Sequence, residues 1–302
     1  MSFASLHRAA CVVVATAALA MFSATASSMT HESTATAPDG VTLSIHETGN
    51  PSGPPIIFIH GLLGSHLNWD AQVQSELAQR YRLISYDLRG HGQSAKPVDA
   101  DAYRDGRRWA DDLNAVIDAT RAERPVLVGW SLGATVISNY LATYGDAQIA
   151  GAVYVDGVIE LASEQIVPHP EVYKGMASSD LRTHLDAERK FLALCFEVQP
   201  AQELFERSLA AAAIASWDMQ QVVQSMTVDV VGGLGRASVP VLMLYGAKDD
   251  LIKADVAIAR AQMINPSVRT MVYEHSGHAP FVEEPARFNR DIAAFVDHAT
   301  AR

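Results

Sequence analysis

A serine lies between two glycines where an apolar segment ends, in PVLVGWSLGATVIS at residues 125–138. A serine hydroxyl is a weak nucleophile at neutral pH and attacks a carbonyl carbon only when a base accepts its proton. Glycines on both sides have no Cβ, so they leave room for a tight turn that exposes Ser131. The same residues also fit a helix start that the Ser131 hydroxyl caps. The motif alone therefore leaves two interpretations, a nucleophile or a helix cap.

An acid and a histidine follow later apolar segments. Asp249 comes after VPVLMLYGAK, and His278 comes after SVRTMVYEHSG. A histidine can accept the serine proton and later return it to the leaving group. A carboxylate can orient the imidazole ring and stabilise its charged form. Three other residues compete for these roles: His275 and Asp250 by their nearness in sequence, and Asp156 because it ends the apolar segment AVYVDG.

Four motifs surround these residues: HGLLGSHLNW from His60, DLRGHGQS from Asp87, GWSLGA from Gly129 and GHAPFVEEP from Gly277. With them the sequence resembles the α/β-hydrolase fold family, from about Val41 to the C-terminus. Within that family it looks like the serine esterases that carry a helical cap. The order serine, acid, histidine along the chain is the order of this family's triad.

The resemblance implies a role for each catalytic candidate. Ser131 matches the nucleophile, and His278 matches the family's Gly-His pair that supplies the base. Asp249 matches the acid in a Gly-x-x-Asp pattern. Asp156 remains a competitor, because some members of the family carry their acid after that strand.

The resemblance also implies an oxyanion hole. The backbone N–H of Leu132 follows the nucleophile, and the N–H of Leu62 comes from the loop after the first buried strand. Trp130, beside the nucleophile, is expected to line the substrate pocket. His60 and the segment 87–94 are expected to hold loop geometry, through a salt bridge and hydrogen bonds, rather than to react.

The apolar runs predict the elements that carry these residues. Continuous apolar strands separated by helices are typical of an α/β fold with a mostly parallel, doubly wound sheet. Ligands of such sheets bind beyond the carboxyl ends of the strands. Segment 41–47 follows the turn residues Pro-Asp-Gly and is expected to be half of a β-hairpin. The other predicted strands are 55–61, 81–87, 125–130, 152–157, 239–246 and 267–274. The predicted helices between and after them are 69–80, 109–120, 132–145, 252–264 and 285–298.

A helical block interrupts this alternation. Residues 158–236 contain no convincing strand but two helical stretches, 181–197 and 201–223. We expect this block to be a cap or lid inserted after the sixth strand. The core is then formed by residues 38–157 and 237–302. The small apolar stretch SLAAAAIASW, at residues 208–217, suggests an uncharged pocket under the cap.

Residues 1–26 have the three-part layout of a secretory signal peptide. A short start with Arg8 precedes an uncharged apolar run, and Ala24-Thr25-Ala26 supplies a small-residue cleavage pattern. The run is shorter than the about 20 residues that a membrane-spanning helix needs. We expect cleavage near Ala26, export to the periplasm or the medium, a flexible leader over 27–37 and no stable membrane insertion afterwards. A retained N-terminal anchor is the alternative.

The composition excludes other classes. A formal net charge of −11, with 49% hydrophobic and 19% charged residues, is typical of a soluble globular protein that does not bind nucleic acid. The densest basic stretch, residues 104–109, is followed at once by Asp111 and Asp112. The sequence contains no HExxH or CxxC motif and no phosphate-binding glycine loop in a suitable context, so it predicts neither a metal nor a cofactor. Cys195, in FLALCF, is expected to be an inert buried thiol.

These residues predict a serine hydrolase that cleaves a carboxylic ester or a related acyl bond of a small molecule. The same fold and triad also serve proline-releasing peptidases, lactonases, carbon–carbon hydrolases and cofactor-free haloperoxidases, and the residues leave these open. A binding protein without activity would not need all three triad side chains. The sequence does not determine the oligomeric state.

Overall fold

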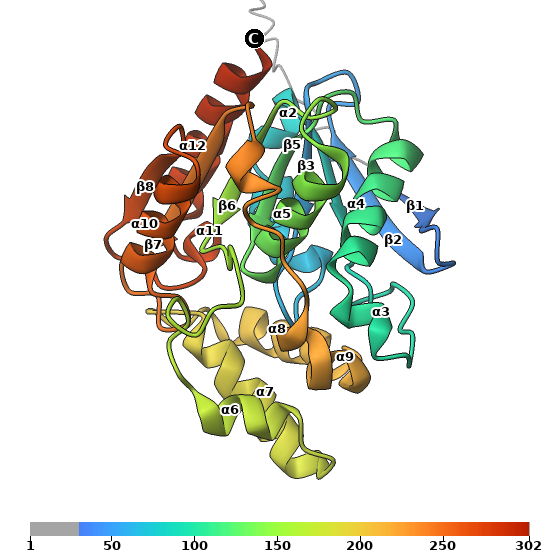
Figure 1. Ribbon diagram of the computed structural model, residues 1–302, viewed down its shortest axis with the longest axis vertical. Helices are drawn as coiled ribbons and strands as arrows, with labels where there is room; N and C mark the ends of the chain where they lie inside the picture. The colour runs from blue at the N-terminus through green and yellow to red at the C-terminus, as the bar shows by residue number, and fades with distance from the viewer. Residues whose placement is uncertain (1–29, 302) are drawn as a thin grey trace, which may run out of the picture.

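The structure is a computed structural model that describes residues 30–301. One eight-stranded sheet, in the order β1-β2-β4-β3-β5-β6-β7-β8, forms its centre (Figure 1). β2 is antiparallel to β1 and to β4, and all other neighbouring strands are parallel. The predicted α/β fold class with a mostly parallel sheet is confirmed. The strands are β1 (His31–Thr36), β2 (Thr42–Gly49), β3 (Pro55–Ile59), β4 (Arg82–Tyr86), β5 (Val126–Trp130), β6 (Gly151–Val155), β7 (Val241–Gly246) and β8 (Arg269–Tyr273).

Helices cover the sheet. Every residue of β5 and of β6 is buried, which explains why these segments are continuously apolar instead of alternating. Among residues 30–301, none of the helices combines the length and apolar character that crossing a lipid bilayer requires. The helices of the core are η1 (His66–Trp69), α1 (Asp70–Val73), α2 (Leu77–Arg80), α3 (Asp101–Arg104), α4 (Gly106–Thr120), α5 (Leu132–Tyr144), η3 (Leu234–Arg236), α10 (Ala254–Ile264), α11 (Pro280–Glu283) and α12 (Pro285–Thr300).

The predicted flexible leader is wrong from His31 onward. Residues 31–36 form β1, which pairs along its whole length with β2. The turn that the sequence indicated makes this possible, because Gly40 adopts a positive φ of 86° and its N–H donates to the carbonyl oxygen of Ala37. Ala35 is buried, so the strand also adds to the core. The hairpin prediction is confirmed. The predicted signal peptide, residues 1–26, lies outside the described residues.

The cap follows the sixth strand, as predicted, and lies across the lower end of the sheet in Figure 1. Its helices are α6 (Pro170–Met176), α7 (Leu181–Leu194), α8 (Gln202–Ala213), α9 (Trp217–Val222) and η2 (Val223–Ser225). The predicted helix 201–223 is divided, because the Ser216 side chain accepts the N–H of Met219 and starts a new helix. α6 was not predicted, although its first turn contains Pro170, a residue favoured at helix starts.

Candidate active site

Ser131 occupies a strained turn between β5 and α5. Its φ of 51° and ψ of −114° lie outside the helical and strand regions. Backbone strain of this kind is found where the surrounding structure holds a functional side chain in place. Ser131 stands at the N-cap position, yet its side chain makes no capping hydrogen bond. The helix-cap interpretation of the motif is therefore wrong, and the hydroxyl is free for another use.

Two glycines make this turn possible. A Cβ on Gly129 would lie 2.6 Å from the carbonyl oxygen of Gly133, and a Cβ on Gly133 would lie 2.4 Å from the carbonyl oxygen of Ile59. Both distances are far shorter than van der Waals contact, and both partners are backbone atoms that cannot move aside. The glycines of the motif are thus a packing requirement of the turn that presents Ser131.

His278 and Asp249 are joined by a short hydrogen bond. His278 Nδ1 lies 2.7 Å from Asp249 Oδ2, and both side chains are buried. The other oxygen of Asp249 accepts the N–H groups of Leu251 at 2.8 Å and of Ile252 at 3.0 Å, which fixes the carboxylate. His278 Nε2 is also buried and has no hydrogen-bond partner within residues 30–301. This nitrogen is available to accept a proton.

The competing residues do not make this pair. His275 and Asp250 are exposed. Asp156 is fully buried, but its Oδ1 accepts the N–H of Gly246 at 2.7 Å, and it has no hydrogen bond to His278. Of the carboxylates predicted for the acid role, Asp249 is the one bonded to His278.

Trp130 joins the serine turn to the histidine loop. Its indole N–H donates to the carbonyl oxygen of His278 at 2.6 Å, and its ring packs against Phe281 at a centroid distance of 5.0 Å. It does not line the cavity that contains Ser131. The expectation that Trp130 forms the substrate pocket is therefore wrong, because the indole hydrogen bond turns the ring toward the histidine loop.

The two predicted oxyanion residues lie beside the serine. Leu62 and Leu132 line the same cavity as Ser131. A Cβ on Gly61 would lie 3.1 Å from Ser131 Cβ, so the loop after β3 closely approaches the turn. Leu132 opens α5, and the first N–H groups of a helix have no partner within it. Both residues thus lie beside Ser131. That their N–H groups form the oxyanion hole stays a prediction.

An apolar cavity of about 390 Å³ opens onto Ser131. The core and the cap both contribute to it, and it contains no Asp, Glu, Lys or Arg side chain among the described residues. The uncharged pocket is as the sequence suggested, but residues 208–217 do not form it. Ser208 and Ala211 line a separate cavity of about 20 Å³ beside Trp130. The lining residues are Leu62, Ser131, Leu132, Val158, Leu161, Ser163, Ile166, Pro168, His169, Pro170, Tyr173, Phe191, Val223, Gln224, Leu251 and Ile252.

Glu283 connects the cap to the histidine loop. One carboxylate oxygen accepts the N–H groups of Glu197 at 2.9 Å and Val198 at 3.0 Å, just after α7. The other accepts the N–H of Gly277 at 2.8 Å, next to His278. This acid belongs to the motif GHAPFVEEP, but no role was predicted for it. Its contacts hold one end of the cap against the loop that carries His278.

Cys195, near the same end of the cap, is buried and forms no disulfide. Burial raises the pKa of its thiol well above the ordinary value, and the nearby Asp249 carboxylate adds to this. A thiol held in its neutral form is unreactive. The expectation of an inert cysteine agrees with this environment.

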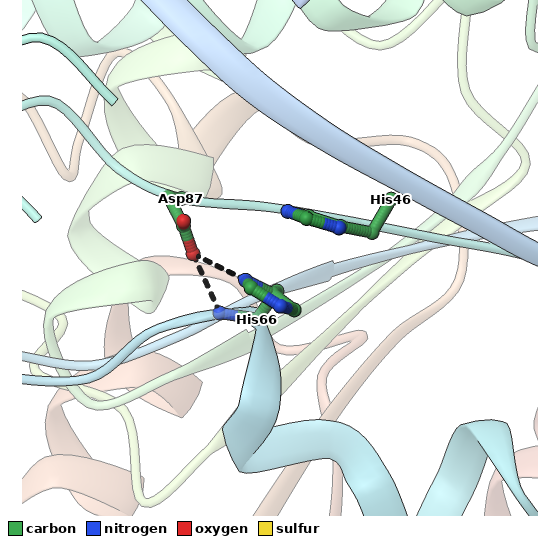
Figure 2. A group of neighbouring side chains, drawn as sticks. All are labelled: His46, His66 and Asp87. Atoms are coloured by element: carbon green, nitrogen blue, oxygen red, sulfur yellow. Dashed lines mark hydrogen bonds and ion pairs between the residues drawn. The ribbon is translucent and has the colours of Figure 1, made fainter. Parts of the chain in front are cut away.

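Within residues 30–301, one side-chain cluster outside this site has metal-ligand residue types, and Figure 2 shows it. The rings of His46 and His66 stack at 3.5 Å with an interplanar angle of 15°. Nitrogen lone pairs lie in the ring planes, so stacked rings cannot direct them at one ion at the about 2.1 Å that a metal needs. Asp87 already accepts the backbone N–H groups of His66 and Gln93. The cluster is therefore built to hold loops together.

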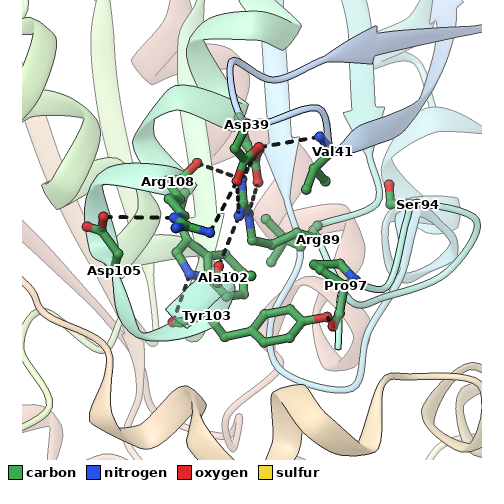
Figure 3. Close-up of polar contacts among 12 residues, drawn as sticks. Asp39, Val41, Arg89, Ser94, Pro97, Ala102, Tyr103, Asp105 and Arg108 are labelled. Carbon is green, nitrogen blue, oxygen red and sulfur yellow. Dashed lines mark hydrogen bonds and ion pairs between the residues drawn. The ribbon is translucent and has the colours of Figure 1, made fainter. Parts of the chain in front are cut away.

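Arg89, in the segment 87–94, is buried and uses all its donors. Figure 3 shows it facing Asp39. It holds Asp112 with two bonds of 2.6 and 2.7 Å, and it donates to Asp39 at 2.9 Å. The remaining N–H groups reach the carbonyl oxygens of Ala102 and Arg108. The structural role expected for this segment is confirmed for Arg89, which ties the β1–β2 turn to α4.

Replacing Arg89 with lysine is expected to lower the free energy of unfolding by about 3 kcal/mol or more. An ammonium group cannot form the paired bonds of a guanidinium, so Asp112 would remain buried without a full partner. Urea unfolding measures the loss. Arg107→Lys is the matched control, because Arg107 is exposed and solvent screens its pair with Asp111, so the pair contributes little to stability. Equal unfolding midpoints for Arg89→Lys and wild type would contradict this account of the segment.

Two buried histidines are expected to make the protein sensitive to acid. Burial lowers the pKa of His60 to about 4 and, with repulsion from His60, that of His91 to about 3. Both pKa values lie below the about 6.5 of an unfolded chain, so the unfolded state binds protons first as the pH falls. Their contribution to stability is complete above pH 6.5 and is lost progressively toward pH 4 and pH 3.

Urea unfolding should therefore give a free energy lower by about 2 kcal/mol per histidine at pH 5 than at pH 7. His91→Gln should weaken this pH dependence, since glutamine does not titrate. His275→Gln, at an exposed position, should leave it unchanged. Identical unfolding curves for wild type at pH 5 and pH 7 would show that the buried histidines do not act in this way.

The fold and these motifs define the class of protein. Residues 54–285 match the family model described as the alpha/beta hydrolase fold, so the chain belongs to this family. Its relatives and structural neighbours include many esterases and other hydrolases, and the chain is an esterase-like hydrolase.

Three esterases illustrate this similarity. A crystal structure of a proposed aryl esterase from Burkholderia cenocepacia is 63% identical, with a TM-score of 0.89 over 90% of this chain and 100% of that one. The esterase RhEst1 from Rhodococcus sp. ECU1013 is 30% identical, with a TM-score of 0.79 over 88% of this chain and 98% of that one. A bifunctional esterase/perhydrolase from Acinetobacter calcoaceticus is 25% identical over 86% of this chain and 98% of its own length.

Proposed function

We propose that this protein is a serine carboxylesterase that acts on small, uncharged esters through an acyl-enzyme. The observation that carries the proposal is the buried bond of 2.7 Å between His278 and Asp249, combined with the strained turn that presents Ser131 to an apolar cavity. These are the parts that nucleophilic acyl transfer requires: an activated hydroxyl, a base and a group that orients the base.

In the proposed reaction, Ser131 Oγ attacks the ester carbonyl while its proton passes to His278 Nε2. The ionised Asp249 accepts the N–H of His278 Nδ1, which keeps Nε2 free as the base and stabilises the charged ring. The N–H groups of Leu62 and Leu132 hold the oxyanion of the tetrahedral intermediate.

Collapse of this intermediate breaks the bond to the alcohol, which takes the proton from His278 as it leaves. Water then attacks the acyl-enzyme with the same base, and the carboxylic acid and free Ser131 are released.

The cavity favours a neutral substrate. A peptidase that removes N-terminal residues must bind an ammonium group, and a buried ammonium needs an acidic partner. The described lining contains no Asp or Glu. The 63% identity to a proposed aryl esterase supports esters with an aromatic group. Perhydrolysis is a second candidate, because one relative is named an esterase/perhydrolase and hydrogen peroxide can replace water in releasing the same acyl-enzyme.

A substrate panel tests this proposal. We expect p-nitrophenyl and phenyl esters of short, uncharged acids to be hydrolysed, with activity falling as the acyl chain outgrows the cavity. Lactones and aminoacyl anilides are expected to react at least about tenfold more slowly, since a few kcal/mol of mismatched binding has that effect. Adding hydrogen peroxide and assaying peracid tests perhydrolysis. A preference for aminoacyl anilides over neutral esters would overturn the proposed substrate class.

We also propose that the protein is exported, and the residue pattern of its first 26 positions is the support for this. Mass spectrometry of the protein recovered from its native host should find an N-terminus near Ser27. An intact Met1 on protein from the cell interior would contradict export.

A further inference from the structure

A second carboxyl group is buried beside the proposed triad. Asp156 follows β6 with a positive φ of 43°, and its side chain is fully buried. Side-chain ligand atoms of Asp156, Asp249 and His278 all lie within 4.8 Å of one another. The proposed mechanism gives Asp156 no role, although an unpaired buried charge at this place would be costly.

The hydrogen bonds of the two carboxyl groups are unequal. Asp249 accepts three, from His278 Nδ1 and from the N–H groups of Leu251 and Ile252. Asp156 accepts one, from the N–H of Gly246 at 2.7 Å, and its Oδ2 is buried without any partner within residues 30–301. Donors stabilise an ionised carboxylate, so the charge belongs on Asp249. Because no donor reaches Oδ2 of Asp156, this oxygen can carry a proton and donate a hydrogen bond itself.

We propose that Asp156 is protonated at neutral pH and donates a hydrogen bond from Oδ2 to the Asp249 carboxylate, which makes it a positioning residue for the triad acid. Two carboxyl groups this close share one negative charge, because ionising both without a counter-charge is prohibitive. The proposed bond from Asp156 adds a fourth donor to the Asp249 carboxylate, beside those of His278, Leu251 and Ile252.

The other groups around Asp156 agree with this protonation. Besides Asp249 and His278, the titratable neighbours are Glu283 on α11, Cys195 after α7 and Tyr245 on β7. None of these three can supply a positive charge. Burial, and then repulsion from Asp249, raise the pKa of Asp156 well above its ordinary value.

Two substitutions separate this role from a general structural one. Asparagine keeps both functions of a protonated aspartate, because its amide can donate to Asp249 and accept from Gly246, and it tolerates a positive φ. Glycine adopts the same φ but removes the donor. The inference rests on the proposed function for its kinetic consequence, but the protonation state can be measured without any turnover.

Infrared difference spectroscopy at pH 7 is the direct measurement. Wild type should show the C=O stretching band of a protonated carboxyl group, and this band should be missing from Asp156→Asn. The control Asp250→Asn should keep the band, because the carboxyl group replaced there is exposed. A spectrum in which wild type and Asp156→Asn share the same protonated-carboxyl bands would overturn the proposal. A wild-type protein without esterase activity would contradict the proposed function instead. The infrared band would still show whether Asp156 is protonated.

The pH profile of kcat/KM gives a second readout. For Asp156→Asn we expect an acid limb within about 0.3 pH units of wild type and a kcat within about twofold. An Asp156 that was ionised would place a second negative charge beside the His278 ring, so its replacement by asparagine would move the acid limb of the profile down by about one unit or more. That shift would also overturn the proposal. Asp156→Gly should lower kcat about tenfold and move the acid limb upward, since Asp249 loses a donor.

Discussion

Replacing Ser131 with alanine is expected to lower kcat for p-nitrophenyl acetate by about 10⁶-fold, the size of effect seen when a serine hydrolase loses its nucleophile. The physical reason is that no other group in the described cavity can form the acyl-enzyme. Ser163 also lines it, but it lies in the chain after β6, outside the strained turn that presents Ser131.

The variant should still fold, because the Ser131 side chain makes no capping hydrogen bond and loses only a hydroxyl. Circular dichroism and urea unfolding check this. Ser208→Ala, on α8 of the cap, is the matched control and should keep wild-type kcat. A Ser131→Ala protein that retained a tenth of the activity would exclude Ser131 as the nucleophile.

Replacing Asp249 with asparagine is expected to lower kcat by about 10⁴-fold, as in the serine-protease triad. The amide nitrogen of asparagine can donate to His278 Nδ1, which favours the tautomer whose Nε2 carries the proton. The ring could then no longer act as a base toward Ser131. KM should change little, because Asp249 does not line the cavity. Steady-state kinetics at saturating ester separates the two parameters.

The competing acid supplies the control for this prediction. Asp156→Asn should retain nearly full activity, and so should Asp250→Asn at an exposed position. A 10⁴-fold loss in Asp156→Asn, together with an active Asp249→Asn, would mean that the family's other acid position is used here.

The sequence could predict those parts of the site that depend on strand order. Parallel strands bring their carboxyl ends to one edge, so residues that follow β7 and β8 had to lie near one another. The bond between Asp249 and His278 shows this, although the two residues are far apart in the chain. The glycines of the serine motif have steric reasons that the sequence already suggested.

Features that depend on single side-chain directions could not be predicted. The ring of Trp130 was expected to face the substrate, but its N–H bonds the carbonyl oxygen of His278. The helices of the cap were only partly predicted, because a short helix such as α6 has too few turns for a periodic pattern. The strand β1 was missed because its exposed face is polar and only Ala35 is buried.

The orphaned Oδ2 of Asp156 and the contacts of Glu283 are further examples. Each sits in a motif that the sequence displayed, at a strand end or in GHAPFVEEP. What neither motif reveals is how many donors reach each carboxyl group, and this number decides where a proton or a charge resides. Such counts require the packed structure.

Covalent labelling with a fluorophosphonate, followed by intact mass spectrometry and peptide mapping, tests most directly whether Ser131 is the nucleophile. We expect that wild type gains one adduct, that the adduct maps to Ser131, and that the folded Ser131→Ala variant gains none. An adduct on Ser131→Ala, or a wild-type adduct on another residue, would contradict the claim that Ser131 is the nucleophile of this hydrolase.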